Sequence, residues 1–95
     1  MVYNGPVNTS QKNHHVYILR CADGTLYCGY TTDVDRRLIE HNGAGKVPGA
    51  RYTSGRRPVV MVYRESFVTR SEAQKREAEV KKLSKLQKVQ LIKQA

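Results

Sequence analysis

The stretch HHVYILRCADGTLYCGYT, residues 14–31, is typical of two short β-strands joined by a tight turn. Residues 16–21 and 26–30 are rich in β-branched and aromatic side chains, which favour strands. The dipeptide Asp23-Gly24 between them is a strong hairpin signal. The chain therefore begins its fold with an antiparallel hairpin, and the length of the turn decides which side chains share a face.

Two turn lengths are open, and they place Tyr17 and Tyr27 differently. A two-residue turn puts the two phenols on opposite faces of the sheet. A three-residue loop of residues 22–24, with Gly24 left-handed, pairs Tyr17 with Gly29 and puts both phenols on one face. Only the second register lets the tyrosines act together. If the tyrosines serve only to form the strands, neither register is required. In that register Gly29 is expected to leave room above the backbone for a substrate.

The length and composition indicate one small domain. A chain of 95 residues supports one hydrophobic core, and no apolar run is long enough to span a membrane. Residues 1–13 are polar and carry no export signal, so we expect a flexible arm there and a single domain over residues 14–95. A cytoplasmic location follows as the default. In that reducing setting Cys21 and Cys28 are expected to be packing thiols.

The middle of the chain predicts a helix, a long loop and a third strand. The helix starts at Thr32, which forms a weak capping box with Asp35, and stops at Asn42-Gly43. Residues 43–58 are rich in glycine and proline and are expected to form a loop. The continuous apolar run at residues 59–64 suggests a strand in the centre of the sheet.

Two further helices follow. Thr69 and Glu72 form a capping box for a helix that runs to about residue 83. Ser84 and Gln87 form another, opening a short basic helix at the C-terminus whose apolar members are Leu86, Val89 and Ile92. The order β-β-α-β-α-α predicts an α+β fold in which helices flank a small three-stranded antiparallel sheet.

The charge distribution points to a polyanionic partner. Seventeen Lys and Arg against eight Asp and Glu give a net charge of +9, and residues 43–58 and 80–95 contain no acidic side chain. Arginines alternate with an aromatic and hydroxyl groups in the first segment, which suits phosphates and unpaired bases. The alternative is a merely solvated face. The predicted nucleic-acid contacts are Lys46, Arg51, Tyr52, Arg56, Arg57, Lys81 and Lys82.

Polar groups converge on the predicted helix faces. Arg37 and His41 lie beside the apolar face of the first helix, and Glu77 lies on the apolar stripe of the later one. A structural ion pair of Glu77 with Arg37 or Lys81 is one explanation. The other is a phosphodiesterase site, in which a carboxylate holds a metal, an arginine binds the phosphate and a phenol moves a proton.

These residues resemble the GIY-YIG nuclease family, from about Val16 to Leu83. The resemblance rests on the ordered set Tyr17, Tyr27-x-Gly29, Arg37, His41 and Ala73-x-x-x-Glu77. It is greatest with the small stand-alone bacterial members, for which the loop ARYTSGRRP and the tail EVKKLSKLQKVQLI are typical.

The resemblance implies a role for each of these side chains. Tyr17 and Tyr27 line the site, and one of them acts as the base that activates water, directly or through His41. Arg37 steadies the attacked phosphate. Glu77 holds one divalent metal ion, Mg²⁺ or Mn²⁺ rather than zinc. A phenol titrates at about 10, so a tyrosine base needs a nearby positive charge.

Two functions remain open on the sequence. The first is a metal-dependent endonuclease that cleaves phosphodiester bonds in nucleic acid, with DNA the expected substrate. The second is a catalytically weak module that binds nucleic acid through its basic segments. A protein adaptor using the lysine-rich last helix is the least favoured. We expect neither a membrane partner nor a stable protein partner.

Overall fold

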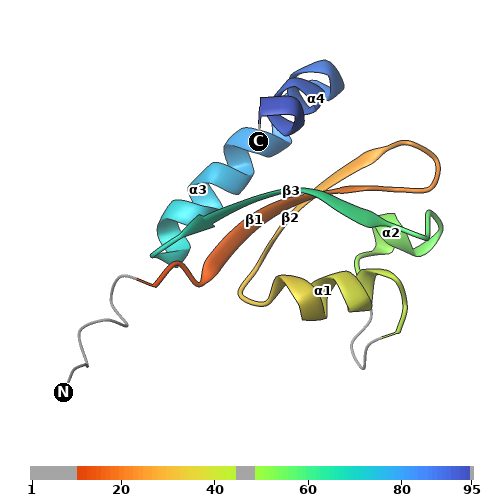
Figure 1. Ribbon diagram of the computed structural model, residues 1–95, viewed down its shortest axis with the longest axis horizontal. Helices are drawn as coiled ribbons and strands as arrows, with labels where there is room; N and C mark the ends of the chain where they lie inside the picture. Colours follow the sequence, from red (N-terminus) through yellow and green to blue (C-terminus); the bar gives the residue numbers. More distant parts are fainter. Residues whose placement is uncertain (1–10, 45–48, 95) are drawn as a thin grey trace.

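Strands and helices follow one another in the predicted order, with one addition. The computed structural model of the chain describes residues 11–44 and 49–94 (Figure 1). Its elements are β1 (His14–Arg20), β2 (Leu26–Thr31), α1 (Val34–His41), α2 (Arg51–Ser54), β3 (Val60–Phe67), α3 (Arg70–Lys81) and α4 (Lys85–Gln94). The addition is α2, a single turn of helix inside the segment expected to be a loop. Most of the predicted N-terminal arm lies outside the described residues.

The hairpin adopts the register that places both phenols on one face. Tyr17 lies opposite Gly29, and Tyr27 lies opposite Leu19. Gly24 has a φ of +84°, the left-handed conformation that the three-residue loop requires. Of the two turn lengths that the sequence left open, the structure therefore has the three-residue loop.

The sheet is antiparallel, but its centre is β1 and not β3. The strand order is β2-β1-β3, so the expectation that residues 59–64 form the central strand is wrong. Val60 in that run is exposed, whereas Val16, Ile18 and Leu19 of β1 are fully buried. An apolar run shows that a strand is covered, but it does not show how many neighbours the strand pairs with.

Helices cover both faces of this sheet. Figure 1 shows α3 and α4 on one side and α1 and α2 on the other. The core accordingly has two parts, because alternate residues of β1 point to opposite faces. One cluster contains Val16, Ile18, Cys28, Tyr63, Ala73 and Val80; the other contains Tyr17, Leu19, Cys21 and Val59. Both cysteines are free and buried, as predicted.

The first helix begins one residue later than the sequence suggests. Asp33 is the N-cap, and its carboxylate accepts a hydrogen bond of 3.1 Å from the Arg36 backbone N–H. Thr32 is therefore not the cap, because aspartate serves that position at least as well as threonine. The predicted left-handed stop is confirmed by Gly43, which has a φ of +82°.

The two C-terminal helices carry the capping boxes that the sequence predicts. Thr69 and Glu72 cap each other at the start of α3, and Ser84 and Gln87 do so at α4. Leu86 is 70% exposed, so its assignment to the apolar face of α4 is wrong. Ile92 packs on the core as predicted, and Leu91, which was not predicted, packs there too. Within residues 11–44 and 49–94, no helix is long and apolar enough to cross a membrane.

Candidate active site

A chain of three buried side chains joins β1 to α1 and α2. The Tyr17 hydroxyl lies 2.8 Å from His41 Nε2, and His41 Nδ1 lies 2.8 Å from Thr53 Oγ1. None of the three is more than 1% exposed. Sequence reasoning selected Tyr17 and His41 for the site, but it missed Thr53, which was considered only as part of the basic loop.

The third member of this chain assigns the imidazole tautomer. The Thr53 hydroxyl donates its one proton to the Ala50 carbonyl at 3.0 Å, so Oγ1 accepts from the Nδ1–H of His41. The Ala50 N–H, at 3.5 Å from Nδ1, is at the limit of hydrogen-bond length. His41 Nε2 is consequently the acceptor, and the Tyr17 hydroxyl donates to it.

Burial keeps both partners uncharged at neutral pH. It raises the pKa of Tyr17 well above its usual value, and a hydrogen bond from the Arg37 guanidinium opposes that rise. Burial lowers the pKa of His41 to about 4, with the positive charges of Arg37 and Arg57 acting in the same direction and Glu40 opposing them. Arg37 thus acts electrostatically on both ends of the Tyr17–His41 hydrogen bond.

Tyr27 contributes its ring to the same imidazole. The ring centroids of Tyr27 and His41 are 5.2 Å apart with the planes at 62°, an edge-to-face contact. On its other side Tyr27 lies 5.6 Å from the Tyr52 ring. The confirmed register therefore places Tyr17 and Tyr27 around one histidine.

Gly29 makes room for Tyr17 and not for a substrate. A Cβ at Gly29 would lie 2.5 Å from Tyr17 Cζ, so any other residue here would displace the phenol. The expected open space above the Gly29 backbone is thus occupied by the Tyr17 ring. The glycine acts on the site by letting that ring reach His41.

Glu40 is a member of the site that sequence reasoning missed. It is buried, and its carboxylate accepts a 2.8 Å hydrogen bond from Arg37 Nη1 while Arg36 Nε lies 3.7 Å away. Two guanidiniums offset the cost of burying this carboxylate. The spacing of three and four residues from the arginines was the available signal. Glu40 holds the guanidinium of Arg37 beside the phenol.

Glu77 lies on α3, across the sheet from α1, yet its charge acts on the phenol. Its carboxylate pairs with Lys81 Nζ at 3.3 Å, one of the two partners expected from sequence. About a fifth of its side chain is exposed, 21%. The negative charge contributes to raising the pKa values of Tyr17 and Cys28. The two helices therefore contribute to one electrostatic environment.

Comparison with known proteins identifies the family of this chain. A model of the GIY-YIG catalytic domain matches residues 13–90. The chain belongs to the GIY-YIG family. A UPF0213 protein of Halobacterium salinarum is 54% identical to it over 79 residues, which cover 83% of this chain and 99% of that protein.

Two solved proteins have similar structures. The solution NMR structure of a UPF0213 protein from Bacillus halodurans is 51% identical, with a TM-score of 0.54, and the match covers 84% of this chain and 82% of that one. The solution NMR structure of an E. faecalis protein is 47% identical, with a TM-score of 0.59 and coverage of 90% and 88%. The similarity to these structures therefore extends over most of the chain, as does the family match to residues 13–90.

The GIY-YIG resemblance implies a divalent metal at Glu77, and the local donor set fits one. Among residues 11–44 and 49–94, no three His, Cys, Asp or Glu side chains gather as a metal cluster. Zinc sites collect three or four such ligands, whereas Mg²⁺ is commonly held by one or two carboxylates, with water and substrate phosphates as its other ligands. The half-buried carboxylate of Glu77 suits the second kind of site.

The arginines of the predicted nucleic-acid segment are partly engaged in the fold. Arg56 Nε donates to Asp23 Oδ2 at 3.0 Å, and its guanidinium lies 4.1 Å from the centroid of the Tyr52 ring. Because Arg56 covers Tyr52, stacking of an unpaired base on that ring requires Arg56 to move. Arg57 Nε donates to the His41 carbonyl at 2.8 Å.

The other predicted basic contacts are more open. Arg51 is exposed at the start of α2, and Lys82 is exposed at the end of α3. Lys81 is exposed but paired with Glu77. Lys46 lies outside the described residues. Among the predicted contacts that the structure describes, Arg51 and Lys82 are therefore the basic side chains most accessible to a ligand.

Proposed function

We propose that this GIY-YIG protein is a metal-dependent endonuclease that hydrolyses phosphodiester bonds in DNA or another nucleic acid. Membership of the GIY-YIG nuclease superfamily supports this class of reaction. The observation that carries the proposal is the 2.8 Å hydrogen bond from the buried Tyr17 hydroxyl to His41 Nε2, beside the Arg37 guanidinium. This hydrogen bond connects a phenol to a proton acceptor, and the Arg37 guanidinium beside it would bind the phosphate.

Tyr17 is the tyrosine we assign as the base, because its hydroxyl already donates to an acceptor. The attacking water gives a proton to the phenol oxygen as the phenol gives its own proton to His41 Nε2. The water oxygen bonds to phosphorus, and the bond from phosphorus to the leaving oxygen breaks. Solvent then protonates the leaving oxygen, and His41 later releases its proton to solvent.

The bound phosphate makes this transfer more favourable. In the free protein, Arg37 is among the charges that hold the pKa of His41 low. A phosphate anion on Arg37 offsets that positive charge and so raises the basicity of His41. Glu40 keeps the guanidinium in position for this contact. Proton transfer is thereby coupled to occupancy of the phosphate position.

Glu77 is the residue that would hold the metal ion. When bound there, the ion supplies positive charge to the phosphate and to the leaving oxygen. Lys81, which pairs with Glu77 in the structure, would have to give up part of that contact.

The test is cleavage of labelled duplex, branched and single-stranded DNA and RNA in the presence of Mg²⁺ or Mn²⁺. We expect the wild type to cut at least one substrate and Glu77→Gln, Arg37→Ala and Tyr17→Phe to lower the rate by about 10² or more. Glu79→Gln is the matched control, since it removes one carboxylate from an exposed position of the same helix.

The outcomes separate the two candidate functions. If the wild type binds nucleic acid but cuts nothing with either metal, and Glu77→Gln binds equally well, the protein is a binding module. If Tyr27→Phe abolishes cleavage while Tyr17→Phe does not, the assignment of the base is wrong and the proposed reaction class stands.

A further inference from the structure

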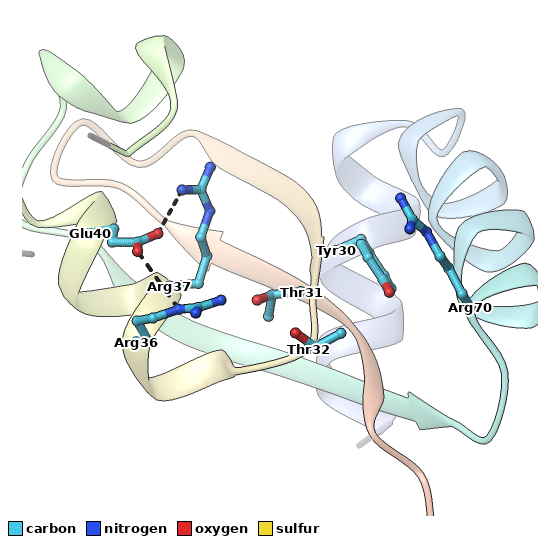
Figure 2. A pocket seen from close by; sticks show the side chains of 7 residues that line it. All are labelled: Tyr30, Thr31, Thr32, Arg36, Arg37, Glu40 and Arg70. Atoms are coloured by element: carbon cyan, nitrogen blue, oxygen red, sulfur yellow. Dashed lines mark hydrogen bonds and ion pairs between the residues drawn. The ribbon is translucent and has the colours of Figure 1, made fainter. Parts of the chain in front are cut away.

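A pocket of about 500 Å³ opens beside Arg37. Figure 2 shows it between α1 and the start of α3, with Tyr30, Thr31 and Thr32 at the end of β2 between them. Arg36, Arg37 and Glu40 line it from α1, and Arg70 lines it from the first position of α3. Because Arg37 borders both this pocket and the Tyr17 hydroxyl, the two sites are contiguous.

The charges in the pocket select an anion. Three arginines and one glutamate line it, which leaves an excess of two positive charges. The glutamate, Glu40, is buried and already bound by Arg37, so its charge is offset within α1. Arg36 is only 3.7 Å from Glu40 and is 61% exposed, so it remains able to reach a ligand. The Thr32 hydroxyl adds a neutral donor, whereas the Thr31 hydroxyl already donates to the Asp33 carbonyl at 3.2 Å.

Arg70 is held at the pocket by an aromatic ring. Its guanidinium carbon lies 5.9 Å from the Tyr30 ring centroid, within the range of a cation–π contact. Tyr30 is itself fixed, because its hydroxyl lies 2.8 Å from His14 Nδ1 and the two rings stack. Within residues 11–44 and 49–94, Arg70 makes no ion pair. Its charge is available to a ligand in the pocket.

We propose that this pocket binds a second phosphate of the nucleic-acid strand, adjacent to the phosphate that Arg37 holds for cleavage. Arg70 and Arg36 are its cationic ligands, and Tyr30 orients Arg70. The inference rests on the proposed function, since it takes the ligand to be a phosphodiester chain. It assigns a role to Arg70, which had no role in the predicted site. It also assigns one to Arg36, whose side chain is exposed on α1.

The test is the salt dependence of oligonucleotide binding to the full chain, measured by fluorescence anisotropy in Ca²⁺ buffer. Loss of one phosphate contact lowers the slope of log K against log[salt] by about 0.7 to 0.9. We expect this decrease for Arg70→Ala and for Arg36→Ala. Arg70→Lys should retain the slope. Lys75→Ala is the control, because it removes one exposed charge from α3 outside the pocket and should leave the slope unchanged.

Two results would overturn the inference while leaving the proposed function intact. In the first, wild type and Arg70→Ala bind with the same slope and cut at the same rate. In the second, inorganic phosphate binds at Arg70 as tightly as the oligonucleotide does. The pocket is then a site for small anions and not for a nucleic-acid strand. Failure of the wild type to bind or cut any nucleic acid would overturn both proposals together. A circular dichroism spectrum of each variant checks that it is folded.

Discussion

His41 is the single side chain on which most of the site depends. It accepts from Tyr17, donates to Thr53 and supports the Tyr27 ring, while its own charge is suppressed by burial and by Arg37. An imidazole in such surroundings is uncharged over the whole physiological range. In the free protein His41 is therefore a neutral proton acceptor. Because its pKa differs between the folded and unfolded states, its titration can be measured through folding stability.

Folding stability should fall as the pH drops from 6.5 toward 4. The pKa of His41 is 6.5 in the unfolded chain and about 4 in the folded protein, so the unfolded state binds more protons between these values. The neutral His41 contributes about 3 kcal/mol to the free energy of unfolding; this contribution is fully present above pH 6.5 and is lost as the pH falls through 4. Urea unfolding at a series of pH values, for wild type and His41→Gln, measures it.

The difference in unfolding free energy between wild type and His41→Gln separates the effect of His41 from that of the carboxylates that also titrate in this range. A difference in unfolding free energy that stays constant from pH 4 to 6.5 would contradict the assignment. An NMR titration of the His41 ring gives the folded-state pKa directly, including in conditions where the variant is too unstable to compare.

Helix α1 carries three site residues in eight positions, so its first turn matters to the chemistry. Arg37, Glu40 and His41 all follow the Asp33 cap within a few residues. The cap bond to the Arg36 N–H satisfies an amide that has no partner within the helix. Fraying at this end would loosen Arg37 in particular.

Asp33→Ala should destabilise the protein by about 1 kcal/mol and Thr32→Ala by much less, because Asp33 is the residue that caps α1. Chemical denaturation of both variants is the measurement. Asp33→Ala should also reduce cleavage, through the position of Arg37. Equal destabilisation by the two substitutions would show that the cap is shared with Thr32.

In the assembled domain, the Arg70 pocket lies at the β2 edge of the sheet, and the catalytic cluster lies beside it over the central strand β1. The strand order leaves β2 paired only with β1 among the described strands. Side chains of α1 and the first residue of α3 line one pocket at this edge, with Tyr30 and Thr31 of β2 between them (Figure 2). Arg37 connects this pocket to the catalytic cluster, whereas Lys85 of α4 lies at the hairpin turn, where its Nζ donates to the Gly24 carbonyl at 3.0 Å.

Nucleic-acid binding should therefore slow amide hydrogen exchange in β2 and in the first turns of α1 and α3, with little change in α4. Exchange measured by mass spectrometry with and without an oligonucleotide tests this. The experiment is repeated with Glu77→Gln, in which cleavage of the oligonucleotide does not complicate the comparison. The same segments should be protected in this variant. Protection concentrated in residues 85–94 would instead identify the basic tail as the main binding surface.

Local chemistry determined much of this protein. Asp23-Gly24 located the hairpin turn and limited its register to two alternatives, and side chains three residues apart specified the capping boxes of α3 and α4. The ordered set of residues from Tyr17 to Glu77 carried the resemblance to the GIY-YIG family. These features depend on neighbours in the chain or on order along it, which a single sequence displays directly.

Packing between elements determined the rest. Tyr17 and His41 are 24 residues apart, and His41 and Thr53 are 12 apart, so no local pattern predicts their hydrogen bonds. Periodicity identifies the face on which a side chain lies, but it does not identify what covers that face. For this reason the central position of β1 and the burial of Glu40 followed only from the way helices and strands pack. The filling of the space above Gly29 by a tyrosine ring has the same origin.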